Sequence, residues 1–163
     1  MKIISGGQTG VDRAALDAAI ERGVDWSGWC PKGGWAEDFP DPPGLLAKYP
    51  HLKETPDRHP LQRTEWNVRD GDAILILADS EDLSSSIGTQ RAHKWAGQHG
   101  KPHLVLDVND RDAAVHAKAW VCVQRQRFGP HMVLSIGGPR ESEAPGIYRR
   151  AKNVLTALLK HTA

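Results

Sequence analysis

Short apolar segments alternate along the chain with longer segments in which apolar residues recur every three or four positions. Ala73–Ala78 (AILILA) is a nearly continuous apolar run, as expected for a strand buried on both faces of a parallel sheet. Shorter runs bounded by glycine, proline or asparagine predict four further strands. We expect these strands at Lys2–Ser5, Val24–Cys30, His103–Val108 and Met132–Ile136.

Helical periodicity follows most of these predicted strands. Apolar residues between Val11 and Ala19 recur at helical spacing, and we expect this first helix to end near Gly23. Thr9 is predicted to be its N-cap, with Asp12 three residues later as the capping-box partner. Further helices are expected over residues 61–69, 89–100, 110–125 and from 147 to 158.

The alternation of strands and helices predicts an α/β fold, a three-layer sandwich with a mainly parallel sheet between helices. With 163 residues, a single domain over residues 1–163 is expected. Residues 33–60 carry most of the prolines and are predicted to be mainly loop. Such a long irregular segment inside a compact domain is often functional.

Composition excludes several classes of protein. The formal net charge is only +1, so no global field favours nucleic acid or an anionic membrane, and neither is expected as a partner. No secretory signal or bilayer-spanning run is evident, which predicts a cytoplasmic protein. The two cysteines and eight scattered histidines lack metal-ligand spacing, so no protein-bound metal is expected.

Three loops combine glycine with hydroxyl residues just before a predicted helix, and each follows a predicted strand or strand-and-turn. They are residues 5–10 (SGGQTG), 84–89 (SSSIGT) and 137–142 (GGPRES). Carboxyl ends of parallel strands share one edge of a sheet, where ligands bind. Glycine lets backbone N–H groups approach an anion, and a helix N-terminus adds donors and partial positive charge. We therefore expect residues 5–10 to form a phosphate cradle, with the other two loops as its remaining walls, although this first loop has neither the Walker A nor the strict dinucleotide-binding spacing.

The candidates for neutralising a phosphate are four cations, Lys32, Arg63, Arg91 and Arg140. Arginine in particular suits bidentate phosphate contacts. Arg140 is the strongest of them because it lies within a glycine loop, whereas Lys32 could equally be a solvated surface residue. Trp35 could stack on a flat ring, and some of the six tryptophans are expected at subunit interfaces. The full set of candidate binding residues is Gly6, Gly7, Gln8, Thr9, Gly10, Asp12, Lys32, Arg63, Ser86, Gly88, Thr89, Arg91, Gly137, Gly138, Arg140, Glu141 and Ser142.

Blocks of sequence in the same order along the whole chain resemble the molybdenum cofactor carrier proteins. They include SGGQTGVDRA (5–14), GWCPKG (28–33), AED (36–38), GT (88–89), GGPRES (137–142) and PGIY (145–148). The resemblance implies a Rossmann-like fold and kinship with the lysine-decarboxylase-like phosphoribohydrolases. It also implies homo-oligomers and binding of molybdenum cofactor, a pterin with a dithiolene and a terminal phosphate. The family tends to place a basic residue after Lys32-Gly33, where this chain has Gly34-Trp35.

Two other functions stay open beside that of a carrier. The related phosphoribohydrolases, which cleave the N-glycosidic bond of nucleoside monophosphates, carry Pro-Gly-Gly-x-Gly-Thr-x-x-Glu, and their glutamate assists cleavage. Here Gly88-Thr89 is retained but Ala92 stands where the glutamate is expected, which argues against that chemistry. A sensor that binds a nucleotide would use the same phosphate loops. The sequence leaves open whether the bound ring is a pterin, a purine or a nicotinamide.

Overall fold

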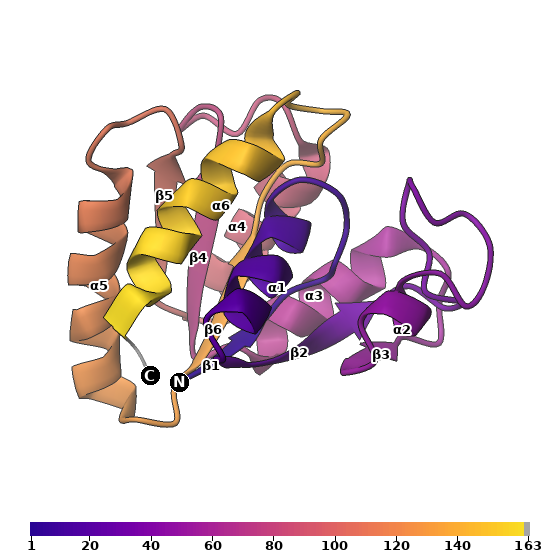
Figure 1. The fold of residues 1–163 in the computed structure, drawn as a ribbon, viewed down its shortest axis with the longest axis horizontal. Coiled ribbons are helices and arrows are strands. Elements are labelled where there is room, and N and C mark those ends of the chain that lie inside the picture. Colours follow the sequence, from indigo (N-terminus) through magenta and orange to yellow (C-terminus); the bar gives the residue numbers. More distant parts are fainter. Residues whose placement is uncertain (162–163) are drawn as a thin grey trace.

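The computed structural model describes residues 1–161 and contains a six-stranded parallel sheet with helices on both faces (Figure 1). It confirms the predicted Rossmann-like α/β fold. The strands are β1 (Lys2–Ile4), β2 (Asp25–Cys30), β3 (Leu52–Glu54), β4 (Ala73–Ala78), β5 (His103–Asp107) and β6 (Val133–Gly137). The helices are α1 (Val11–Glu21), α2 (Leu45–Lys48), α3 (Pro60–Asp70), α4 (Ile87–Gln98), α5 (Ala113–Phe128) and α6 (Ile147–Leu158), followed by a 3₁₀ turn, Leu159–His161.

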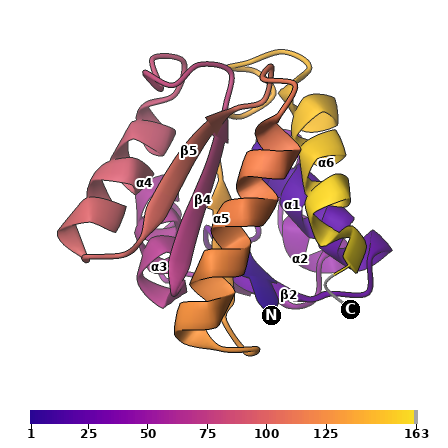
Figure 2. The same ribbon diagram turned by 90° about the vertical axis from the view of Figure 1, so that its left-hand side faces the viewer.

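The strand order β3-β2-β1-β6-β4-β5 explains which face each helix covers. Connections between parallel strands are almost always right-handed, so a change in the direction of travel along the sheet moves the helix to the other face. The chain travels one way from β1 to β3, the opposite way from β3 to β5, and then back to β6. Accordingly, α1, α5 and α6 cover one face while α3 and α4 cover the other (Figure 2).

Strand β4 illustrates how the core is divided between the two faces. Ala73, Leu75 and Leu77 belong to the cluster beneath α1, α5 and α6, whereas Ile74 and Ile76 pack with residues of α3 and α4. All six residues of β4 are buried, as the continuous apolar run predicts. The fully buried alanines of α1 allow this helix to lie close to the sheet and to α6.

The predicted N-cap of the first helix is wrong. Gly10 is the N-cap residue of α1, with φ of 79°, and no side chain of the described residues caps this end. Positive φ is easily adopted by glycine, and a Cβ here would collide with the backbone of residues 139–141. The Thr9 hydroxyl instead donates a hydrogen bond to Glu37, which lies far away in sequence.

Residues 33–60 contain more regular structure than the sequence predicts. Helix α2 and edge strand β3 lie within this segment, and β3 pairs with β2 through Gly28, Trp29 and Cys30. The sequence did not predict the small hydrophobic core to which this segment contributes, because the apolar residues of the core are too widely spaced to show periodicity. This core consists of Leu16, Cys30, Ala36, Leu45, Tyr49 and Leu52.

Candidate functional site

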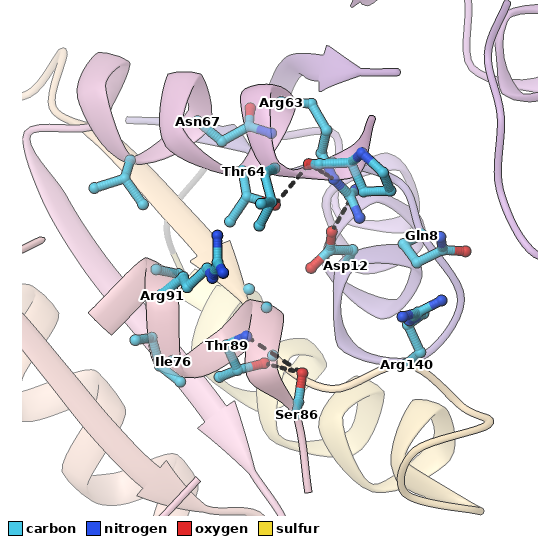
Figure 3. Close-up of a pocket in the computed structure, with 18 of the residues that line it drawn as sticks. Gln8, Asp12, Arg63, Thr64, Asn67, Ile76, Ser86, Thr89, Arg91 and Arg140 are labelled. Atoms are coloured by element: carbon cyan, nitrogen blue, oxygen red, sulfur yellow. Dashed lines mark hydrogen bonds and ion pairs between the residues drawn. The ribbon is translucent and has the colours of Figure 1, made fainter. Parts of the chain in front are cut away.

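A cavity of about 520 Å³ opens at the carboxyl ends of the strands, between α3 and α4 (Figure 3). The loop after β4 leads to α4 on one face of the sheet, whereas the loops after β1 and β6 lead to helices on the opposite face. Loops that diverge in this way leave a crevice at the edge of an open α/β sheet, where ligands bind. The cavity volume lies within the usual range for small-molecule sites, roughly 300–1,000 Å³.

One wall of the cavity is apolar. It includes Ile74 and Ile76 from β4, Val68 from α3 and Ala92 from α4. The two isoleucines face this side because side chains alternate along a strand, which places them opposite Leu75 and Leu77. A surface of this kind suits a flat, weakly polar ring rather than a highly charged group.

A buried ion pair joins α1 to α3 at the cavity. Arg63 Nη1 donates to Asp12 Oδ2 at 3.1 Å, and the two side chains are only 9% and 13% exposed. Burial raises the pKa of Asp12, while Arg63 and the backbone N–H groups of Gly138 and Gln8 oppose the rise. A Cβ on Gly6 would collide with the Arg63 guanidinium and the Asp12 carboxylate, so a larger residue there would displace the ion pair. Asp12 is thus an ion-pair partner and not the predicted capping residue.

The N-terminus of α4 presents open hydrogen-bond donors to the cavity. Ser86 is the N-cap, and its hydroxyl oxygen accepts from the backbone N–H of Thr89 at 3.2 Å. The N–H groups of Ile87 and Gly88 donate to no group within residues 1–161, as expected for the first turn of a helix. Ser86 through Thr89 all line the cavity, so these donors and the helix dipole are available to an anion.

The protein itself closes the N-terminus of α6 and part of the N-terminus of α1. At α1, the N–H of Val11 donates to the Pro139 carbonyl at 3.2 Å, and that of Thr9 donates to the side-chain oxygen of Gln8. At α6, the Glu141 carboxylate accepts from the N–H groups of Gly146 and Tyr148. Of the three predicted glycine loops, only the one before α4 leaves both of its first two helical N–H groups without an acceptor among the described residues.

The candidate cations differ in their partners. Arg91 extends from α4 into the cavity (Figure 3) and makes no hydrogen bond or ion pair within the described part of the chain. Arg140 lies on the cavity rim between two carboxylates, Glu37 at 3.9 Å and Glu143 at 3.5 Å. Lys32 is exposed and does not line the cavity. Of the four candidate cations, Arg91 is consequently the one for which a ligand would compete least with carboxylates of the protein.

Eleven of the seventeen candidate residues line this cavity, and six do not. Those that line it are Gly6, Gln8, Asp12, Arg63, Ser86, Gly88, Thr89, Arg91, Gly137, Gly138 and Arg140. Those outside it are Gly7, Thr9, Gly10, Lys32, Glu141 and Ser142. Sequence reasoning missed the contribution of α3 beyond Arg63, because this helix follows no glycine loop. Its cavity-lining residues include Pro60, Leu61, Thr64, Asn67 and Val68.

Comparison with known proteins places the chain in a family. Residues 3–159 match the model of the circularly permutated YpsA SLOG family. The chain belongs to this family. No curated protein matches it significantly.

A solved structure from Syntrophus aciditrophicus SB, named "Putative molybdenum carrier protein", is 36% identical to the chain. It has a TM-score of 0.82, and the alignment covers 96% of this chain and 93% of that one. The resemblance seen in the sequence is therefore confirmed at the level of the family.

The described side chains include no cluster of three or more histidine, cysteine or acidic residues that could hold a metal ion. In the described part of the chain, no helix is long and apolar enough to cross a bilayer. The Cys30 thiol is buried, and burial raises its pKa to about 11. A thiol with so high a pKa is a poor metal ligand at neutral pH.

Proposed function

We propose that the cavity binds a small molecule with one phosphate and a flat ring, and that the protein serves as a carrier or store for it. The observation that supports this most strongly is the open N-terminus of α4 beside Arg91, which has no partner among the described residues. The two N–H groups of the first turn and the guanidinium would hold the phosphate. The ring would lie against Ile74 and Ile76 on the apolar wall.

Molybdenum cofactor is the ligand that we favour, since a related protein is named a molybdenum carrier. The residues present fit this group in two respects. The cavity volume suits a compact pterin, and the phosphate-binding end is separate from any metal-ligating side chain of the described residues. The cofactor would supply the metal with its own dithiolene, so the protein would contribute phosphate contacts and a wall for the ring. A nucleotide would satisfy the same contacts and remains the alternative ligand.

A carrier rather than a hydrolase is supported by Ala92. This residue lines the cavity and presents a methyl group where the phosphoribohydrolase motif places its glutamate. The carboxylate of Asp12 also faces the cavity, but Arg63 and two backbone N–H groups already occupy it. We further propose that the protein is a cytoplasmic homo-oligomer. Light scattering during size-exclusion chromatography measures the molecular mass and would test the oligomeric state.

The phosphate contact is tested by Arg91→Ala with Lys94→Ala as a matched control. Lys94 is an exposed cation on the same helix, outside the cavity. One charged hydrogen bond is worth about 1.5–3 kcal/mol, so Arg91→Ala should weaken binding of molybdenum cofactor or of adenosine monophosphate roughly ten- to a hundredfold. Isothermal titration calorimetry measures both variants. Equal loss in the two variants, or none in Arg91→Ala, would refute this role for Arg91.

A further inference from the structure

A short strap, residues 36–39, reaches back from the end of β2 to the loops that follow β1 and β6. Ala36 and Phe39 exchange backbone hydrogen bonds, which makes the strap a tight turn. Both carboxylate oxygens of Asp38 accept from the Arg13 guanidinium at 2.9 Å, and Arg13 also donates to the carbonyl of Gly7. The strap is thus anchored independently of the side chain of Glu37.

The carboxylate of Glu37 lies where donors from two different loops meet. The hydroxyls of Thr9 and Ser142 both donate to it, the latter at 2.6 Å, and the N–H of Ser142 approaches at 3.4 Å. Arg140 Nη1 lies 3.9 Å away. Partial burial alone would raise the pKa of Glu37, but the hydrogen bonds from Ser142 and Thr9, with Arg140, lower it.

This arrangement has the composition of an anion site. Two hydroxyls, one backbone N–H and one guanidinium converge on a single negatively charged group, as they would on a phosphate. The site borders the candidate cavity, because Arg140 lines the rim and the buried Gln8, which accepts from the N–H of Glu37, lines the interior. The Glu37 side chain is still 23% exposed, so solvent reaches this position.

We propose that Glu37 acts as a built-in anion that closes a second anion subsite formed by Thr9, Arg140 and Ser142. The native cavity consequently accepts one anionic group, at the N-terminus of α4, because the Glu37 carboxylate already occupies the position that Thr9, Arg140 and Ser142 surround at this rim. The restriction to a ligand with a single phosphate rests on the proposed function, in which the cavity binds a phosphate-bearing molecule. The closed subsite itself rests only on the contacts of Glu37.

Inorganic phosphate is the probe, with three variants. Glu37→Ala removes the carboxylate but keeps the Asp38–Arg13 anchor and the backbone bond to Gln8. Glu37→Gln removes the charge but keeps the volume filled, and Asp38→Ala loosens the strap without touching the subsite. Calorimetric titration should show that Glu37→Ala binds one phosphate more than the native protein. The affinity of Glu37→Ala for this added phosphate should be at least tenfold higher than that of any phosphate bound by the native protein at this rim. The other two variants should show no such gain.

A crystal of Glu37→Ala grown in phosphate should place the added anion on Thr9, Arg140 and Ser142. If Glu37→Ala is less stable than the native protein, formate should restore its melting temperature and leave that of the native protein unchanged. Equal phosphate stoichiometry in Glu37→Ala and the native protein would overturn the proposal. An equal gain in Asp38→Ala would overturn it as well, because a loosened strap would then be sufficient.

The outcomes separate this proposal from the proposed function. If the native protein binds no phosphate and Glu37→Ala binds one, the site at α4 is refuted and the closed subsite stands. If the native protein binds one and Glu37→Ala binds no more, the closed subsite alone is refuted. The double variant Arg91→Ala/Glu37→Ala should retain the added phosphate, since Arg91 does not contact Glu37.

Discussion

Removing Arg63 should destabilise the fold strongly, because it would leave the buried carboxylate of Asp12 without its cation. Breaking a buried ion pair by removing one partner costs about 3–5 kcal/mol. The two side chains are 9% and 13% exposed, so water can compensate little. The N–H groups of Gly138 and Gln8 still favour the charged carboxylate, which indicates the lower end of that range. We therefore expect a loss of about 3 kcal/mol for Arg63→Met.

Urea denaturation followed by circular dichroism measures this loss, and thermal denaturation provides a second readout. For a chain of this length, about 1 kcal/mol corresponds to a shift of roughly 2–4 °C, so the melting temperature should fall by about 6–12 °C. Arg69→Met is the control, because Arg69 lies on the same helix but is 46% exposed and pairs with its neighbour Asp70. That variant should change stability by less than about 0.5 kcal/mol.

The double variant Asp12→Asn/Arg63→Met tests whether the loss comes from the uncompensated charge. It should be more stable than Arg63→Met alone, because the amide needs no cation. Burial raises the pKa of Asp12 even with Arg63 present, and loss of Arg63 raises it further. A raised carboxyl pKa favours the folded state at low pH, and this benefit is lost as the pH rises through the folded-state pKa. The deficit of Arg63→Met relative to the double variant should therefore shrink on acidification. Strictly additive effects with no pH dependence would refute the reasoning.

Two further predictions concern α4 and catalysis. Ser86→Ala removes the side-chain cap of α4 and should cost about 1 kcal/mol of stability, measured by urea denaturation. It should also weaken phosphate binding, measured by calorimetry, and unchanged stability would contradict the capping geometry. The protein should not release ribose 5-phosphate from adenosine monophosphate, because Ala92 supplies no carboxylate. Turnover in a chromatographic assay at rates typical of enzymes, about 1 per second or faster, would contradict the carrier proposal.

The sequence predicted the strand–helix alternation well because the strongest signals are local. The run Ala73–Ala78 and the helical periodicity of residues 147–158 lie where expected. The N-cap of α1 was mispredicted because the hydroxyl of Thr9 binds Glu37, a contact that depends on the tertiary fold. Helix α2 and strand β3 were missed because they are short and rich in nearby proline, so their formation depends on packing rather than on propensity.

The candidate site was predictable in its position but not in which loops are open. All three glycine loops lead from the carboxyl edge of the sheet, as the topology rule requires. Whether a helix N-terminus has free donors depends on groups distant in sequence, such as the Pro139 carbonyl at α1. Closure of α6 by Glu141 depends on a side-chain conformation that spacing alone does not specify. The contribution of α3 became visible only when the fold placed this helix opposite α4.

The most direct test of the account is a crystal structure of the native protein with molybdenum cofactor or adenosine monophosphate bound. We predict that the phosphate lies at the N-terminus of α4, where its oxygens accept from the N–H groups of Ile87 and Gly88 and from the Arg91 guanidinium. The ring should lie against Ile74 and Ile76. A phosphate bound at the turn formed by residues 6–10, or a ligand outside the cavity between α3 and α4, would contradict the proposed site.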